Sequence, residues 1–230
     1  MAPEFIPFRA ARVWGTVRPG GVGTLLEGAR VELSVQEVEA LGARGYFTRP
    51  AFLGDEAALA ARAEALARAE SGVLHAAGIR RGADRTLDTR VRGDLIGWVT
   101  PEPDSALGAL WRQFEQLGQA LSAGAYLGLG RFDLQLACYP GGGAHYSRHF
   151  DAFPGKSNRR ATAIWYANPD WRAEHGGLLR LHPEGESPVD VPPRLDTLVV
   201  FLSERIEHEV LPTHAHRLAL TAWFYGRDAG

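Results

Sequence analysis

The sequence predicts an α+β protein in which helices come first and strands follow. Before Gly130, apolar residues recur at the three- and four-residue spacing of amphipathic helices. After Gly130, short runs rich in β-branched and aromatic residues alternate with Gly, Pro, Asn and Asp. Closely spaced strands of this kind are typical of an antiparallel sandwich or barrel. We therefore expect helices that buttress one sheet of such a core.

Two helices are predicted before residue 71. Ser34 followed by Glu37 has capping-box spacing, so a helix is expected over about 35–44. The run over 56–70 is rich in alanine, the residue with the highest helix propensity, and predicts a longer helix. On one face of this second helix we expect Leu59, Ala63 and Leu66.

A third helix is predicted to begin near Asp104, because the apolar residues that follow recur at helical spacing. These residues are Leu107, Leu110, Trp111, Phe114, Leu117 and Leu121. The most direct expectation for the large indole side chains is a place in the core, and it covers Trp98, Trp111 and Trp171.

The strand-rich half contains the runs FDLQLACY, RATAIWYA, GGLLRLH, DTLVVFLS, HEVLP and HRLALTAWFY. We expect one domain over 1–230, with a mainly helical support over about 34–122 and a strand core over about 130–228. Residues 1–33 and the polar stretch 80–94 are expected to be loops.

Composition excludes several classes of protein. The net charge of −2 shows no excess of basic residues that would favour nucleic-acid binding. The sequence contains no run of eighteen apolar residues, so no membrane-spanning helix is expected. The single cysteine, Cys138, rules out an internal disulfide framework and favours a reducing cytoplasm. Seven of the eight histidines lie between His145 and His216, so histidine-based chemistry is expected in the second half.

The stretch CYPGGGAHYSRHFD, from Cys138 to Asp151, carries the first candidate ligands. It predicts a strand, a glycine-rich hairpin turn and a second strand that ends in His149-Phe150-Asp151. On an extended strand, residues two apart project to the same side, so His149 and Asp151 are expected to lie together. An imidazole and a carboxylate on one face are the beginning of a non-haem iron(II) site.

A third ligand and an anion partner follow further along the chain. His208 is the best candidate for the ligand, since His214 and His216 lie on a turn directly before Arg217. On one strand Arg217 shares a face with Ala219, Thr221 and Trp223. A guanidinium buried beside a metal needs an anion, and its fork suits a carboxylate. A dicarboxylic co-substrate that chelates the metal at one end would meet both needs.

Residues 92–226 resemble the iron(II)/2-oxoglutarate-dependent dioxygenases, specifically the prolyl 4-hydroxylase branch that includes the hypoxia-sensing prolyl hydroxylases. The stretches that carry the resemblance are RGDLIGWV, LACYPGGGAHYSRHFD, IWYANPDW, HGGLLRLHPEG, HEVLP and HRLALTAWFY. A three-residue His-x-Asp motif recurs by chance, whereas this ordered combination is specific. The resemblance implies a double-stranded β-helix, or jelly roll, supported by the N-terminal helices.

The resemblance also implies roles for individual residues. The iron ligands are expected to be His149, Asp151 and His208, and the partner of the distal 2-oxoglutarate carboxylate is expected to be Arg217. The rest of the co-substrate pocket is expected to contain Tyr166, Tyr139, Thr221, Ile164 and Leu179. The substrate entrance is expected to contain Arg92, Asp94, Arg159 and Trp223. No side chain is expected to act as nucleophile or general base, because the metal centre supplies the chemistry.

The implied reaction is hydroxylation of a prolyl residue at C4 in a protein or peptide, coupled to decarboxylation of 2-oxoglutarate to succinate and CO2. It would need Fe(II), O2 and ascorbate as reductant, and no nucleic acid or membrane partner. Hydroxylation of free proline or another small molecule is an alternative, and so is a cupin-like metal-binding module or metal-dependent isomerase. Arg217 with Tyr166 favours the dioxygenase over the latter two. Gln135 is polar where eukaryotic relatives are apolar, which leaves the substrate open.

Overall fold

The structure, a computed structural model, describes residues 30–77 and 91–227. Most of the loop expected over 1–33, and most of the polar loop expected over 80–94, lies outside the described residues.

The three predicted helices are present as α1 (Val35–Arg44), α2 (Asp55–Glu70) and α3 (Ala106–Gly124). The capping box of α1 is confirmed, since the Glu37 amide donates to Ser34 Oγ at 3.2 Å and the Ser34 amide donates to Glu37 Oε2 at 2.8 Å. The predicted apolar stripe of α3 is buried except for Trp111, which is partly buried. No helix in the described part of the chain is long and apolar enough to cross a membrane.

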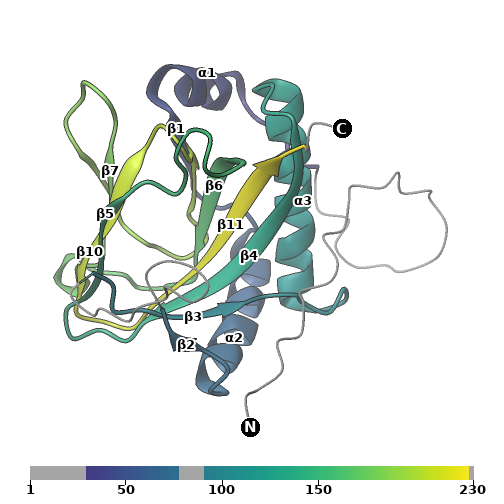
Figure 1. The fold of residues 1–230 in the computed structure, drawn as a ribbon. Coiled ribbons are helices and arrows are strands. Elements are labelled where there is room, and N and C mark those ends of the chain that lie inside the picture. Colours follow the sequence, from purple (N-terminus) through teal and green to yellow (C-terminus); the bar gives the residue numbers. More distant parts are fainter. Residues whose placement is uncertain (1–29, 78–90, 228–230) are drawn as a thin grey trace, which may run out of the picture.

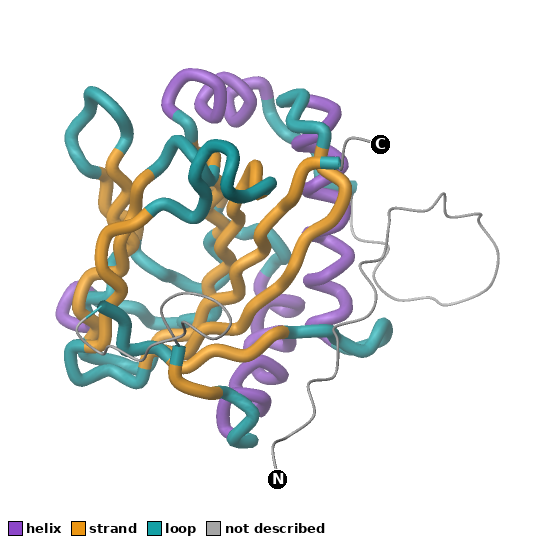
Figure 2. The backbone as a smooth tube through the Cα atoms, viewed as in Figure 1, coloured by secondary structure: helices purple, strands orange, loops and turns teal. Residues whose placement is uncertain are grey.

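The strands form two antiparallel sheets that face each other (Figures 1 and 2). The larger sheet has the order β1-β9-β6-β11-β4-β3-β2. Its strands are β1 (Tyr46–Arg49), β2 (His75–Ala76), β3 (Leu95–Trp98), β4 (Leu129–Tyr139), β6 (Arg159–Tyr166), β9 (Leu198–Leu202) and β11 (Arg217–Gly226). The smaller sheet has the order β5-β10-β7-β8. Its strands are β5 (Ala144–His149), β7 (Leu179–His182), β8 (Val189–Val191) and β10 (Glu207–Thr213). The predicted α+β jelly roll is confirmed.

Two hydrophobic cores lie on the two faces of the larger sheet. One core joins α2 and α3 to the outer face and includes Phe114, Phe132 and Phe224. The helices cover this face on the side away from the smaller sheet (Figure 1). The other core fills the space between the sheets and includes Tyr166 and Leu179. Because side chains alternate along a strand, the strands β1, β9, β6, β11 and β4 each contribute to both cores.

Two expectations about individual faces are wrong. The buried face of α2 consists of Ala58, Ala61 and Ala65, whereas Leu59 is 51% exposed. Small side chains on that face allow α2 to approach α3 closely, so that the Glu64 carboxylate accepts a hydrogen bond from the Leu107 amide at 2.9 Å. Trp98 is also not in the core, because it lies at the end of β3, next to the edge strand β2, with 49% of its surface exposed.

The glycine turn after β4 has an unusual backbone. Gly141, Gly142 and Gly143 have φ angles of 92°, 65° and 89°, all in the left-handed region that residues with a β-carbon rarely adopt. A hairpin turn was predicted here, and this prediction is wrong, because β4 belongs to the larger sheet and β5 to the smaller one. Glycine is therefore required where the chain crosses from one sheet to the other.

Asp196 joins the helical layer to the larger sheet. Its carboxylate is buried and accepts hydrogen bonds from the Leu53 and Gly54 amides, which lie at the start of α2, at 2.8–3.0 Å. It also accepts a hydrogen bond from Trp165 Nε1 on β6 at 2.8 Å. The φ of Asp196 is 60°, a conformation that aspartate and asparagine tolerate better than most residues.

Asp196→Asn should therefore lower the free energy of unfolding by about 2 kcal/mol, because its amide nitrogen would face a buried N–H donor. The backbone conformation suits both residues, so the loss reports the hydrogen bonds. Urea denaturation followed by circular dichroism measures it. Asp190→Asn is the matched control, because Asp190 pairs with Arg180 in an exposed position and its loss should cost less than about 1 kcal/mol. Equal losses in the two variants would contradict this role of Asp196.

Candidate metal centre and co-substrate pocket

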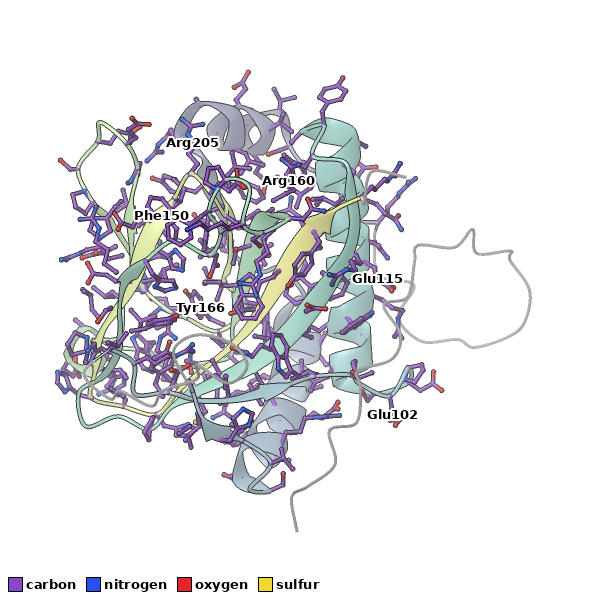
Figure 3. All side chains as sticks on the ribbon, viewed as in Figure 1. Glu102, Glu115, Phe150, Arg160, Tyr166 and Arg205 are labelled. Atoms are coloured by element: carbon purple, nitrogen blue, oxygen red, sulfur yellow. The ribbon has the colours of Figure 1, made fainter. Side chains whose placement is uncertain are left out.

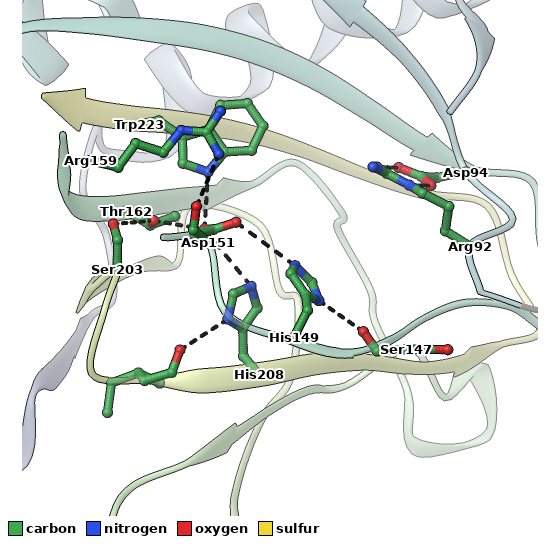
Figure 4. A network of polar contacts seen from close by, with 11 residues as sticks. Arg92, Asp94, Ser147, His149, Asp151, Arg159, Thr162, Ser203, His208 and Trp223 are labelled. Atoms are coloured by element: carbon green, nitrogen blue, oxygen red, sulfur yellow. Dashed lines mark hydrogen bonds and ion pairs between the residues drawn. The ribbon is translucent and has the colours of Figure 1, made fainter. Parts of the chain in front are cut away.

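His149, Asp151 and His208 come together between the sheets (Figure 4). His149 on β5 and His208 on β10 are directly paired across the smaller sheet. Asp151 Oδ1 lies 3.8 Å from His149 Nε2, and Asp151 Oδ2 lies 3.9 Å from His208 Nε2. One ligand atom from each residue lies within 4.8 Å of the others, so the three can hold one metal ion.

The position of Asp151 differs in one respect from the expectation. Strand β5 ends at His149, and Asp151 lies in a bend just after it rather than on an extended strand. The bend still directs the carboxylate toward both imidazole rings. His149 and Asp151 therefore lie together as expected, but the bend after β5 brings them together and strand alternation does not.

Both imidazoles are oriented by backbone carbonyls. His149 Nδ1 lies 2.8 Å from the carbonyl oxygen of Ser147, and His208 Nδ1 lies 3.3 Å from that of Ile206. A carbonyl oxygen only accepts, so each Nδ1 carries the proton and donates. Each ring then directs the lone pair of Nε2 toward Asp151, which is the arrangement that histidine ligands of metals adopt.

Asp151 is held by three further residues. Its Oδ2 accepts hydrogen bonds from Thr162 Oγ1 at 2.7 Å and from Trp223 Nε1 at 3.0 Å. Thr162 gives its only hydroxyl proton to Asp151, so Ser203 Oγ, 2.9 Å away, must donate to Thr162. Thr162 and Ser203 are fully buried. The hydrogen bonds from Ser203 to Thr162 and from Thr162 to Asp151 fix the carboxylate without supplying a positive charge (Figure 4).

The electrostatics of the cluster favour a cation at its centre. Burial, followed by the neighbouring His208 ring, lowers the pKa of His149 to about 4, so that its Nε2 lone pair is free at neutral pH. Burial opposes ionisation of Asp151, but His208, His149 and the Thr162 hydroxyl outweigh it and hold the pKa of this carboxyl below its usual value. Two neutral imidazoles and one carboxylate are the donor set of non-haem iron(II) sites.

Arg217 occupies the same inter-sheet core and is 2% exposed. Its guanidinium carbon lies 4.9 Å from the centre of the Tyr139 ring and 5.0 Å from that of Tyr166. Its Nε donates to the Gly177 carbonyl at 2.9 Å, and no acidic side chain pairs with it among the described residues. Gly177 is needed there, because its φ is 62° and a β-carbon would lie 2.9 Å from Thr213 Cβ and 3.1 Å from Arg217 Cδ.

Tyr166 lies between the sheets beside Arg217 (Figure 3). Its hydroxyl is fully buried and has no hydrogen-bond partner. Burial raises the pKa of Tyr166 to about 12, against the opposing effect of the Arg217 charge, so the hydroxyl keeps its proton and can donate. A buried cation without an anion and a buried hydroxyl without an acceptor both fit one carboxylate.

The other predicted pocket residues line the same space. Ile164 and Leu179 are buried members of the inter-sheet core. Thr221 is half-buried and is paired with Ile164 on β6 and with Gln135 on β4. Burial raises the pKa of Tyr139, so this hydroxyl also stays protonated.

The predicted entrance residues lie close to the same cluster. Arg159 Nη1 donates to the backbone carbonyl of Asp151 at 3.3 Å, and its guanidinium lies 4.4 Å from the centre of the Trp223 ring. Arg92 makes a two-point ion pair with the buried Asp94 at 2.6 and 2.8 Å. Burial disfavours the charge of Arg92, but Asp94 outweighs it and raises the pKa.

Several contacts of the cluster were not predicted. Tyr146 stacks on His149 with ring centres 3.9 Å apart, and Phe201 packs 4.6 Å from His208. Thr162 could have been found, because strand alternation places it on the same face as Ile164 and Tyr166. Tyr146 could not, because it shares a side with His149 only through the irregular register between β5 and β10.

Comparison with known proteins agrees with this geometry. Residues 134–225 match the model of the 2OG-Fe(II) oxygenase superfamily. A prolyl-4-hydroxylase of Pseudomonas putida has a crystal structure with a TM-score of 0.75 and 35% sequence identity, and the match covers 84% of this chain and 98% of that one. This chain belongs to the prolyl hydroxylases of the 2OG-Fe(II) oxygenase superfamily. Membership implies Fe(II), 2-oxoglutarate and O2.

Two animal proteins extend the comparison. A prolyl hydroxylase from Trichoplax adhaerens, solved in complex with a hypoxia inducible factor peptide fragment, has a TM-score of 0.76 and 30% identity over 82% of this chain and 87% of that one. Egl nine homolog 1 of Rattus norvegicus is 40% identical over 145 residues, or 60% of this chain. The chain spans 43% of the length of that rat protein.

Thr162→Val should weaken metal binding about 10-fold, because it removes the hydroxyl that orients Asp151 while preserving side-chain volume. Competition with a chromophoric chelator under anaerobic conditions measures the affinity independently of turnover. Thr48→Val, on the exposed side of edge strand β1, is the matched control and should leave the affinity unchanged. An unaltered affinity in Thr162→Val would show that the Trp223 contact alone orients the carboxylate.

Proposed function

We propose that this chain is an iron(II)- and 2-oxoglutarate-dependent dioxygenase that hydroxylates a prolyl residue at C4 in a protein or peptide. The observation that carries the proposal is a buried guanidinium, Arg217, which has no acidic partner among the described residues and lies beside the unpaired Tyr166 hydroxyl, in the same inter-sheet core as a His-Asp-His cluster. A cupin-like metal-binding module or a metal-dependent isomerase does not need a buried cation directed at a carboxylate.

In this proposal His149, Asp151 and His208 hold Fe(II) on one side and leave its other positions open. Iron with 2-oxoglutarate and O2 supplies the oxidative chemistry, in which the co-substrate is decarboxylated to succinate and CO2 while the substrate is hydroxylated. The chain's own contribution is to keep the ligands oriented. Thr162 and Trp223 perform this role by fixing one oxygen of Asp151.

Arg217 and Tyr166 would bind the distal carboxylate of 2-oxoglutarate. The guanidinium offers N–H donors and charge, and the protonated Tyr166 hydroxyl adds a further donor. Thr221 and Tyr139 stand beside them, while Ile164 and Leu179 form apolar walls that exclude water. Burial strengthens each of these polar contacts because the surroundings have a low dielectric constant.

The proposed substrate is a proline in a protein or peptide. Support comes from the Trichoplax relative, which was solved with a peptide, and from the polar and aromatic groups around Asp151. In the proposal Arg159 and Trp223, together with the Arg92–Asp94 pair, contact the peptide near the reacting proline. Ascorbate as external reductant and a reducing cellular compartment are further parts of the proposal.

Arg217→Gln should weaken 2-oxoglutarate binding by about 100-fold, because it removes the buried partner of a carboxylate, and should change iron affinity far less. Anaerobic titration of the Fe(II) protein with 2-oxoglutarate, followed by the metal-to-ligand charge-transfer band, measures the first quantity. Arg180→Gln, which affects an exposed ion pair, is the matched control.

Asp151→Ala should abolish the band. Equal losses of iron and 2-oxoglutarate binding in Arg217→Gln would indicate unfolding, and no band in the unmodified protein would refute the assignment.

A second measurement distinguishes a peptidyl from a free-proline substrate. With Fe(II), 2-oxoglutarate, O2 and ascorbate, proline-containing peptides should gain the mass of one oxygen atom, and succinate should form in equal amount. Mass spectrometry with fragmentation locates the added oxygen on proline. Free L-proline in the same assay should stay unmodified, and its hydroxylation in preference to every peptide tested would establish the small-molecule alternative.

A further inference from the structure

Two buried polar side-chain atoms of the described residues have no hydrogen-bond partner, Tyr166 Oη and Arg62 Nε. The proposed co-substrate accounts for the first. Arg62 lies on α2, in the helical layer, and its guanidinium makes no hydrogen bond or ion pair with any residue that the structure describes. A buried N–H donor that lacks an acceptor is costly, so the buried Nε of Arg62 suits a ligand of its own.

Arg62 lines a small cavity of about 150 Å³. The other principal lining side chains are Asn168, Trp171, His175, His216 and Leu218. No Asp or Glu is among the described residues that line it. His216 is exposed and His175 half-buried, so the cavity is open to solvent on its histidine side.

Two of the lining side chains already have their hydrogen bonds. The Asn168 amide nitrogen donates to the Pro193 and Leu218 carbonyls, and its oxygen accepts from the Leu218 amide. Trp171 Nε1 donates to the Gly176 carbonyl at 3.1 Å. The groups left to meet a ligand are therefore the guanidinium and the two imidazoles.

Each imidazole presents a donor. His175 Nδ1 accepts from the Arg172 amide at 3.2 Å, so a neutral ring carries its proton on Nε2. His216 Nε2 lies 2.9 Å from Cys138 Sγ. Burial raises the pKa of the Cys138 thiol to about 11, so the thiol is protonated and can donate to Nε2; in that tautomer the proton of His216 is on Nδ1. Trp171 orients His175 through an edge contact of 5.0 Å between ring centres.

The cavity is separate from the proposed co-substrate pocket. His216 and Leu218 flank Arg217 in sequence, and alternation along the strand directs Leu218 to the opposite face. Leu218 accordingly belongs to the core beneath the helices, whereas Tyr139 and Tyr166 beside Arg217 belong to the core between the sheets. Two cationic positions thus lie back to back across β11.

We propose that this cavity is a second anion site, which binds a small oxyanion, either a carboxylate or a phosphate. The guanidinium supplies charge and a planar fork of N–H donors, which suits two oxygens of one ligand. The N–H groups of His175 and His216 add donors from the solvent side. Trp171 and Leu218 provide walls that shield the pair from water and so strengthen it.

The test is a titration of the metal-free full chain with inorganic phosphate and, separately, with acetate, at constant ionic strength set by chloride. Binding raises the melting temperature in proportion to the logarithm of ligand concentration. Arg62→Gln should raise the phosphate or acetate dissociation constant about 10-fold or more, since one charge-assisted contact is lost. His216→Asn, which leaves the guanidinium in place, should weaken binding by a smaller factor.

Two controls make the outcome specific. Arg172→Gln changes an exposed arginine on the neighbouring loop and should keep the anion-dependent stabilisation. Arg217→Gln changes the inter-sheet pocket, which would itself bind a carboxylate, and should keep the part of the stabilisation that Arg62→Gln removes. Retention in Arg217→Gln also separates this site from the proposed function. A preference for acetate assigns the site to carboxylates, and a preference for phosphate assigns it to phosphates.

Three results would overturn the proposal. The first is the absence of stabilisation by either anion in the unmodified chain. The second is stabilisation that Arg62→Gln leaves unchanged. The third is a lower melting temperature for Arg62→Met than for the unmodified chain in anion-free buffer, which would show that the guanidinium already has a partner. The proposal expects an equal or higher melting temperature, because the substitution removes an unpaired cation.

Discussion

The register of β11 is the constraint on which the core beneath the helices and the core between the sheets both depend. This strand is hydrogen-bonded along both edges, to β4 and to β6, and it lies between two hydrophobic cores. Arg217 and Ala219 face the smaller sheet, and Leu218, Leu220 and Phe224 face the helices. A shift by one residue would place the arginine under the helices and leucines in the polar pocket. The burial of both faces of β11, one in each core, disfavours that shift.

Features that depend on neighbouring residues could be predicted from the sequence. The capping box at Ser34 and Glu37 set the start of α1, and the apolar spacing of α3 named the side chains that it buries. The strands of the second half followed from composition and turn residues. His149, Asp151 and His208 lie together as expected. This could be predicted because the motifs and the resemblance together indicated which strands approach one another.

Features that depend on packing between distant segments could not be predicted. Tyr146 lies against His149 only because the pairing of β5 with β10 is irregular, and no local pattern records that irregularity. The alanine face of α2 is buried because α3 comes close to it, although leucine is the more apolar residue. Cys138 and His216 are 78 positions apart and meet through the β4–β11 register.

The glycine turn at 141–143 has a consequence for how the two sheets are held. The chain changes sheets over three consecutive residues with positive φ, a backbone conformation that residues with an L-configured β-carbon rarely adopt. Around Gly142 and Gly143 an added β-carbon would meet nothing within 4 Å, so the obstacle there is chirality alone and not space. A D-amino acid at Gly142, introduced by chemical ligation, would favour the positive φ of the turn and reduce the number of conformations of the unfolded chain. The turn that joins the two sheets, between Tyr139 and His149, would then be more rigid than with any of the genetically encoded amino acids.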